Sequence, residues 1–218
     1  MKIGSISEDK KFEKRISITP DIAKKYLSQG FKVSIEEDYG EHLGFSNDSF
    51  IKEGCKIDGK ENILKNSSII LQLNLPQDIN LQMIETNNIL IGVFNAYKNK
   101  EKLINLSNKK INIFSLELLP RITRAQSMDI LSSQANLAGY KSVIESFANF
   151  TKAIPMMMTA AGTIPAAKVL VIGAGVAGLQ AIATAKRMGA IVFATDVRMS
   201  SKEQVESLGG KFLTVEGS

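Results

Sequence analysis

Short runs of apolar, often β-branched residues alternate with polar segments of helix length along the first half of the chain. The runs that predict strands are Lys2–Ile6, Phe31–Ile35, Ile69–Leu75, Ile89–Phe94 and Ile111–Ser115. A helix is predicted between the first two, because Thr19-Pro20-Asp21 is typical of a helix N-terminus and Gly30 of a helix end. Strands separated by helices indicate a parallel sheet with crossover helices. The runs at 69–71 and 89–91 predict strands covered on both faces.

The pattern changes between Pro120 and Pro155. A polar stretch, Arg121–Gln134, leads there into a predicted long helix at about Asn136–Phe150. We place a domain boundary near Gly139, which gives a first domain of residues 1–138 and a second of residues 139–218. The second domain is predicted to contain strand Lys168–Ile172, a helix from about Gly178 to Met188, strand Ile191–Thr195, helix Ser201–Leu208 and strand Lys211–Val215. The predicted fold class is α/β, with two Rossmann-like parallel-sheet domains.

The second domain has fewer predicted strands than a complete dinucleotide-binding sheet, which normally has about six. We therefore expect this domain to be incomplete at its C-terminus, as in a fragment or one piece of a split protein. An unpaired sheet edge near Phe212–Val215 would be a liability for solubility.

A glycine motif supplies the main chemical signal. Gly173-Ala174-Gly175-Val176-Ala177-Gly178 fits G-x-G-x-x-G between a predicted strand and a predicted helix, which is the context that dinucleotide binding requires. Gly173 permits the tight turn, Gly175 lets the backbone approach a pyrophosphate, and Gly178 allows close packing of helix and strand. The helix N-terminus offers N–H groups and partial positive charge to phosphates. We assign Gly173, Gly175, Val176 and Gly178 to cofactor binding.

Asp196 ends the strand that follows this motif, where a carboxylate can accept hydrogen bonds from both ribose hydroxyls of an adenosine. The same charge repels a 2′-phosphate, so NAD is favoured over NADP. Arg198 argues instead for NADP, because a nearby Arg can accommodate that phosphate. Alternatively, Arg198 lies along the adenosine or is simply solvated. Together with Val197, these residues complete the predicted adenosine site.

Composition and charge argue against several classes of function. The net charge of +5 is spread over Lys pairs with acidic neighbours, which favours a solvated surface over nucleic-acid binding. Cys55 is the only cysteine, so intrachain disulfides and multi-Cys metal sites are excluded, and no metal site is predicted. The only histidine, His42, is interpreted as a surface-loop residue.

No secretory signal is recognised after Met1. The apolar region Ala153–Leu179 is interrupted by prolines and glycines, so it does not predict a membrane span. We expect a soluble protein without direct membrane insertion. Within that region, Met156–Met158 taken alone indicates core or a soft interface.

Around the glycine motif, the sequence resembles the NAD(H)-binding α subunits of proton-translocating nicotinamide nucleotide transhydrogenases. The similar segments are 153–166, 178–186, 195–198 and 202–212, and Arg15–Pro20 resembles the opening that these subunits share with alanine dehydrogenases. The polar stretch Arg121–Gln134 is also similar to the loop that reaches the nicotinamide in this family. The resemblance assigns Arg121, Gln126, Asp129 and Ser132 to catalysis. It places Gln126, Ser127, Met128, Asp129 and Ser132 at the cofactor.

The resemblance also implies partners. NADP(H) is expected on a different component, a membrane-spanning component would couple hydride transfer to proton movement, and a homodimer is expected. The implied location is cytoplasmic, peripheral to the inner membrane through partner subunits.

Two other functions remain open. An alanine dehydrogenase-like oxidoreductase needs proton chemistry, for which that family uses a Lys after the strand near Leu71 and a His after the strand near Phe94. This chain has Gln72 at the first position and Asn95-Ala96-Tyr97 at the second, without a His. The third hypothesis is a non-catalytic NAD-binding fragment that needs its other half.

Overall fold

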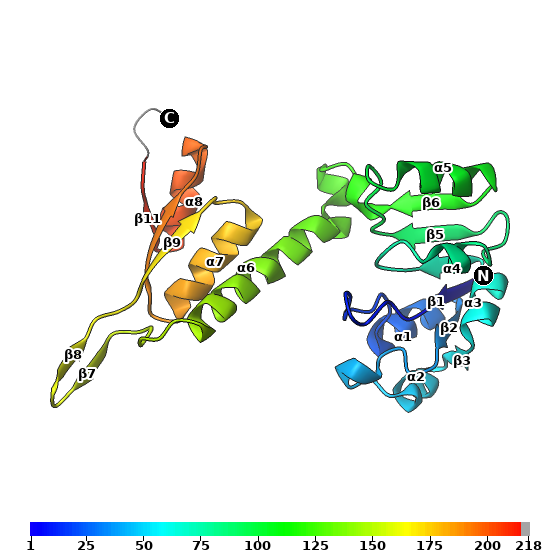
Figure 1. Cartoon of the computed structure of the whole chain (residues 1–218), viewed down its shortest axis with the longest axis horizontal. Coiled ribbons are helices and arrows are strands. Elements are labelled where there is room, and N and C mark those ends of the chain that lie inside the picture. The colour runs from blue at the N-terminus through cyan, green and yellow to red at the C-terminus, as the bar shows by residue number, and fades with distance from the viewer. Residues whose placement is uncertain (215–218) are drawn as a thin grey trace. The chain divides into compact units, whose positions relative to one another are not determined.

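The computed structural model describes residues 1–214 and divides the chain into two compact units (Figure 1). Unit 1 comprises Met1–Asp129, and unit 2 begins at Ile130. Val215, the last residue of the final predicted strand, lies outside the described residues. Both units contain a parallel sheet, which confirms the predicted α/β class.

Unit 1 is built on a six-stranded sheet in the order β3-β2-β1-β4-β5-β6, with every neighbouring pair parallel. The strands are β1 (Lys2–Ser5), β2 (Lys32–Glu36), β3 (Lys56–Asp58), β4 (Ile69–Leu71), β5 (Ile89–Gly92) and β6 (Asn112–Ser115). The helices are α1 (Pro20–Ser28), α2 (Asn47–Glu53), α3 (Lys60–Asn66), α4 (Asp78–Leu81) and α5 (Lys100–Asn108). Short 3-10 turns lie at η1 (Glu41–Leu43), η2 (Leu116–Leu118) and η3 (Thr123–Met128).

Two apolar clusters cover the two faces of this sheet. Ile70 belongs to the cluster that contains Ile63 and Leu64 of α3. Its neighbours Ile69 and Leu71 pack against the other cluster, with Ile3 and Val33. Because successive side chains of a strand point to opposite faces, both faces of β4 are covered, as the apolar run predicted.

Two features of unit 1 differ from the expectations. The strand predicted at Ile69–Leu75 ends at Leu71, because Leu73 and Asn74 donate their backbone N–H groups to the Glu8 carboxylate. The edge strand β3 and helices α2 and α3 were not predicted. β3 has only three residues, two of them charged, so it carries no strong apolar pattern.

Unit 2 contains a three-stranded parallel sheet in the order β11-β10-β9 and a separate antiparallel hairpin. The strands are β9 (Lys168–Ile172), β10 (Ile191–Thr195) and β11 (Lys211–Phe212), and the hairpin pairs β7 (Met157–Thr159) with β8 (Gly162–Ile164). The helices are α6 (Ile130–Ala148), α7 (Val176–Arg187) and α8 (Lys202–Ser207), with a 3-10 turn η4 (Met199–Ser201). Buried side chains of all three helices gather with Val192 and Ala194, on one face of the sheet.

Helix α6 begins six residues earlier than the predicted start at Asn136. The polar residues ahead of Asn136 fit inside the helix, because the Ser133 hydroxyl donates a hydrogen bond to the carbonyl of Ile130. Further along, Gly139 lies at the crossing with α7, where a Cβ atom would be 2.1 Å from the carbonyl oxygen of Ala177. The predicted domain boundary near Gly139 thus falls within α6.

Of the two interpretations of the methionine run, core or a soft interface, the hairpin shows that core is wrong. Met156, Met157 and Met158 are all exposed, and 79% of Met158 is accessible to solvent. Their apolar pattern resembles that of a buried strand, but all three residues of β7 are exposed. Throughout residues 1–214, the helices are too short or too polar to cross a lipid bilayer.

Candidate functional site

The candidate site is built around the turn that joins β9 to α7. Gly173 has a φ of +97°, a left-handed conformation that residues with a Cβ rarely adopt, and its N–H donates to the carbonyl of Thr195 at 2.8 Å. This bond ties the start of the turn to the end of β10. The tight turn predicted from the glycine motif therefore lies at the carboxyl edge of the sheet.

The other two motif glycines serve different purposes. A Cβ at Gly178 would lie 1.8 Å from the carbonyl oxygen of Gly173, so only glycine lets α7 pack against the turn. Gly175 precedes the first residue of α7, and a Cβ there would meet nothing within 4 Å. The space in front of Gly175 is thus open to a ligand, as a phosphate-binding turn requires.

The N-terminus of α7 faces the same turn. No side chain of the described residues caps it, and Gly175 occupies the N-cap position. The first backbone N–H groups of a helix have no partner inside the helix, and the helix dipole adds partial positive charge there. The twelve-residue α7 can therefore hold a phosphate at this end.

Asp196 lies directly at this turn. Its Oδ2 accepts a hydrogen bond from the Ala174 N–H at 2.7 Å, and its side chain is only 6% exposed. The carboxylate is thereby fixed at the carboxyl edge of the sheet, beside the glycine backbone. This is the position from which a carboxylate reaches the ribose of a bound adenosine.

Arg198 contacts the same carboxylate. Its backbone N–H and Nε donate to Asp196 Oδ1 at 2.8 and 3.0 Å, and its Nη2 donates to Oδ2 at 3.1 Å. The guanidinium and these hydrogen bonds hold the pKa of Asp196 well below its usual range, so the carboxylate is charged at neutral pH. The Arg198 side chain is 60% exposed, so it can move aside and free the carboxylate oxygens for ribose hydroxyls. The neighbouring Val176 and Val197 are also exposed.

The residues assigned to the nicotinamide end lie where unit 1 ends and unit 2 begins. Arg121 and Gln126 are exposed on the segment that contains η3, while Asp129 ends unit 1 and Ser132 lies in the first turn of α6. Ser127 and Met128 are exposed between them. Within unit 2, hydrogen bonds join the glycine turn to Asp196, and Asp196 to Arg198.

Unit 1 contains a polar pocket of about 280 Å³ that the sequence did not reveal. It lies where the residues after β1 meet those after β4, the point at which the strand order reverses. Its lining includes Glu8, Glu13, Gln72 and Asn74. Burial raises the pKa of Glu8, although N–H groups of Leu73 and Asn74 oppose that rise. These residues are far apart in the sequence, so no local motif could predict the pocket.

Gln72 is a structural part of this pocket. Its Oε1 accepts hydrogen bonds from the Ile6 N–H at 2.9 Å and the Ser5 hydroxyl at 3.0 Å, while its Nε2 donates to Glu8 at 3.2 Å. The residue is 4% exposed. Because both polar atoms of the Gln72 amide are hydrogen-bonded, the side chain connects β1 to β4. An amide does not titrate near neutral pH, so it cannot act as a proton acceptor.

Cys55 and His42, the only cysteine and the only histidine, do not lie in surroundings that would make them reactive. Cys55 is buried, and burial raises the pKa of its thiol to about 11, so it is not a thiolate at neutral pH. His42 is exposed in η1, and its Nε2 is 2.7 Å from the Lys14 carbonyl oxygen. Within residues 1–214, no three His, Cys, Asp or Glu side chains are grouped as metal ligands.

Comparison with protein families gives matches over both units. The model of the alanine dehydrogenase/PNT N-terminal domain matches residues 4–138, and that of the C-terminal domain matches residues 142–218. Among curated proteins, the first part of the NAD(P) transhydrogenase subunit alpha of Rickettsia prowazekii is 46% identical over 222 residues. That match takes in 99% of this chain and 58% of the relative, so the chain spans little more than half the relative's length.

Solved structures agree on the fold. A transhydrogenase from Sinorhizobium meliloti superimposes with a TM-score of 0.94 at 43% identity, covering 98% of this chain and 64% of that one. An L-alanine dehydrogenase superimposes with a TM-score of 0.83 at 20% identity, covering 99% and 61%. The second likeness shows a shared fold alone.

Proposed function

Because this chain belongs to the alanine dehydrogenase/PNT family, we propose that it is the NAD(H)-binding part of a proton-translocating NAD(P)+ transhydrogenase. In this role it passes hydride between NADH and NADP+ held on a partner component. The proposal is supported by the names of relatives that are 39–46% identical over 99% of the chain. Because the chain covers only part of those relatives, the activity belongs to the assembled protein.

One observation carries the cofactor assignment. The Asp196 carboxylate is fixed by the Ala174 N–H inside the glycine turn, beside the N-terminus of α7. Phosphates at the helix end and a ribose at Asp196 fit this arrangement, with Gly175 leaving space for the pyrophosphate. The negative charge of Asp196 disfavours a 2′-phosphate. We therefore assign NAD(H) to this chain and NADP(H) to its partner.

Transhydrogenation does not require a side chain that accepts or donates a proton at the reacting carbon. When bound, the nicotinamide ring supplies or accepts the hydride at carbon, without proton exchange there. The protein has to hold the ring at near-attack distance and exclude water. In our proposal the Arg121 guanidinium binds the nearby phosphate, while Gln126, Asp129 and Ser132 bind the carboxamide and ribose.

The alternative of an alanine dehydrogenase is disfavoured by Gln72 and Asn95. Oxidation of an amine to an imine releases protons, which requires groups that can accept them. Gln72 is held by Ser5, Ile6 and Glu8, and an amide does not titrate. Asn95 follows β5 without a histidine near it in sequence.

The remaining parts of the proposal concern assembly. The chain acts with an NADP(H)-binding component and a membrane-spanning component, and it forms a homodimer within the complex. It is cytoplasmic and peripheral to the inner membrane, to which the partner subunits attach it. Nucleic acid is not among its proposed partners.

A nucleotide titration tests the cofactor assignment. Nicotinamide fluorescence of the chain, assembled with the part of the Rickettsia prowazekii relative that lies beyond the matched region, should show NADH binding much more tightly than NADPH. Asp196→Asn should weaken NADH binding about ten- to a hundredfold, because charge-assisted hydrogen bonds to ribose are lost. Asp78→Asn, an exposed carboxylate in unit 1, is the matched control and should bind as the wild type does. Equal affinities for NADH and NADPH would refute the assignment.

A second assay separates the two enzymatic functions. Mixed with an NADP(H)-binding component, the assembled chain should exchange hydride between NADH and an NADP+ analogue, and alanine should not reduce NAD+. Alanine-dependent formation of NADH would overturn the transhydrogenase proposal.

A further inference from the structure

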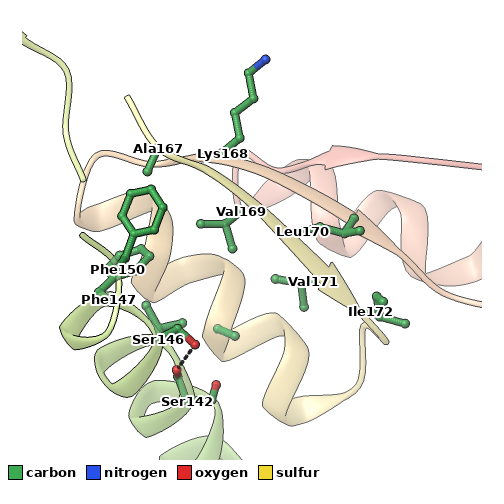
Figure 2. A pocket seen from close by; sticks show the side chains of 12 residues that line it. Ser142, Ser146, Phe147, Phe150, Ala167, Lys168, Val169, Leu170, Val171 and Ile172 are labelled. Carbon is green, nitrogen blue, oxygen red and sulfur yellow. Dashed lines mark hydrogen bonds between the residues drawn. The ribbon is translucent and has the colours of Figure 1, made fainter. Parts of the chain in front are cut away.

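The Asp196 carboxylate is held by backbone groups at the turn that follows β9. Figure 2 shows Ile172 at the end of β9, and α7 begins at Val176 after the glycine turn. Within the turn, the Ala174 N–H donates to Asp196 Oδ2 at 2.7 Å, and Ala174 is only 1% exposed. The backbone N–H of Arg198 donates to Oδ1 at 2.8 Å. These two backbone bonds fix the carboxylate in place.

The other acceptor positions of this carboxylate are occupied by one side chain. An ionised carboxylate has about four lone-pair positions, shared between its two oxygens. The Arg198 Nε donates to Oδ1 at 3.0 Å, and its Nη2 donates to Oδ2 at 3.1 Å. Together with the two backbone bonds, each oxygen of Asp196 then accepts two hydrogen bonds. A further donor can bind this carboxylate only if one of these bonds is given up.

The backbone and side-chain bonds differ in how readily they can be exchanged. Release of the Ala174 N–H would require the glycine turn to open, and the Gly173 N–H ties that turn to the carbonyl of Thr195. The Arg198 side chain, in contrast, is 60% exposed. An exposed guanidinium exchanges its partner for water readily, since exposed ion pairs contribute little to stability. The two guanidinium bonds are therefore the ones that a ligand can displace.

The number and placement of these two bonds match the ribose of an adenosine. The Arg198 guanidinium donates one N–H to each oxygen of Asp196, as in the bidentate pairs that arginine forms with carboxylates. A ribose with free 2′- and 3′-hydroxyls also presents two neighbouring donors, and a carboxylate at this strand end can accept from the ribose. The guanidinium and the ribose therefore compete for the same two acceptor positions.

We propose that Arg198 is a latch on the ribose subsite. Its guanidinium occupies two acceptor positions of Asp196 in the empty chain, and both hydroxyls of the adenosine ribose replace it when the nucleotide binds. This inference rests on the proposed function, in which Asp196 binds the adenosine of NAD(H). Because two charge-assisted hydrogen bonds have to break before two new ones form, Arg198 lowers the affinity for adenosine although it lies in the binding site.

The latch also favours a nucleotide with a free 2′-hydroxyl. In NADP(H) a phosphate takes the place of that hydroxyl, so the ribose offers only its 3′-hydroxyl in exchange for two guanidinium bonds. While it is bonded to Asp196, the Arg198 guanidinium is also less available to pair with a 2′-phosphate. The arginine that argues for NADP by its position in the sequence thus supports NAD(H) in this arrangement.

Binding of adenosine tests the latch without any effect of phosphate charge. The chain is assembled as for the nucleotide titration, and its affinity for adenosine is measured by NMR titration. Arg198→Met, which removes the guanidinium and keeps an unbranched stem, should bind adenosine about two- to fivefold more tightly than the wild type. Arg187→Met, at the exposed far end of α7, is the matched control and should bind as the wild type does. Equal or weaker binding by Arg198→Met would overturn the proposal.

A second ligand separates the exchange of hydrogen bonds from simple obstruction of the site. 2′,3′-Dideoxyadenosine lacks both ribose hydroxyls, so it leaves the guanidinium on Asp196. Arg198→Met should therefore gain no affinity for this compound. An equal gain for adenosine and for the dideoxy compound would show that Arg198 only obstructs the pocket, and the proposed exchange would be wrong.

The arginine side chain itself can be followed by NMR. Before nucleotide is added, the Arg198 Nε–H should exchange with water more slowly than that of Arg187, because it donates to a carboxylate oxygen of a side chain that is 6% exposed. Saturating NADH should remove this protection. A lack of protection at the start, or protection that persists with NADH bound, would overturn the latch alone. Protection at the start without any binding of NADH would instead sink the proposed function.

Discussion

At Gly178 a Cβ atom would lie 1.8 Å from a backbone carbonyl oxygen, whereas at Gly175 it would meet nothing within 4 Å. Gly175 also has an ordinary negative φ of −78°. The two glycines of one motif are therefore required for different reasons. Gly178 is needed for packing within the protein, and Gly175 leaves room for what binds outside it.

This difference predicts that the same substitution affects stability at Gly178 and cofactor binding at Gly175. Gly178→Ala should lower the free energy of unfolding of unit 2 by about 1–3 kcal/mol, because the added methyl group overpacks the turn. Gly175→Ala should leave that free energy within about 0.5 kcal/mol and weaken NADH binding instead. Urea unfolding and NADH fluorescence measure the two effects. Equal losses of stability in both variants would contradict the assignment of separate roles.

Glu13 provides a pH-dependent contribution in unit 1. Arg15 donates a hydrogen bond to its carboxylate at 2.6 Å and holds the pKa of Glu13 at about 2. This folded-state value lies below the unfolded value of about 4.3. The resulting stability is complete above the unfolded pKa and is lost as the pH falls towards 2.

The corresponding variant is Glu13→Gln. Because the ion pair is partly solvated, the variant should lower the free energy of unfolding by about 1 kcal/mol or less at pH 7. The difference from wild type should disappear near pH 2. Denaturant unfolding at several pH values measures it. A difference that grows as the pH falls would contradict the ion pair as its source.

At the scale of elements, helices α6 and α7 meet through Gly139. Propensity alone favours Ala over Gly in a helix by about 1 kcal/mol. Gly139→Ala should nevertheless destabilise unit 2 by about 1–3 kcal/mol, because the Cβ would collide with the Ala177 carbonyl. Asn136→Ala, at an exposed position of the same helix, is the control and should be neutral or stabilising. Thermal unfolding compares the two, and a stabilised Gly139→Ala variant would rule out the close crossing.

The elements that sequence predicted correctly share a strong local signal. β5, β9 and β10 are largely apolar runs, β2 alternates apolar and polar residues, and α1 begins at Pro20 after the Thr19 N-cap. β3 was missed because a short, charged edge strand has no such run. Helix α6 was predicted too late because Ser132, Ser133 and Gln134 are common in loops, and their place in a helix depends on tertiary packing.

At the scale of the whole molecule, unit 1 has two apolar clusters, one on each face of its sheet, and unit 2 has one, between its helices and its sheet. A change in one core should therefore leave the other unit intact. Gly92→Ala, whose Cβ would lie 2.2 Å from the Gln72 carbonyl oxygen, should speed amide exchange within unit 1. Gly139→Ala should do so within unit 2. Matching changes in both units from either variant would show that the chain unfolds as one body.

The sequence by itself determined the α/β class and the position of the glycine turn, because apolar periodicity, N-caps and glycine spacing act over a few residues. It also predicted Asp196 as the residue that lies at that turn. Only the tertiary structure decided that Arg198 contacts the Asp196 carboxylate and that Gln72 joins β1 to β4. The same is true of the exposure of Leu170 and Ile172 on β9. These features depend on which strands become neighbours and which side chains meet at the strand ends. The residues concerned are far apart in the chain, so a local sequence pattern cannot predict their contacts.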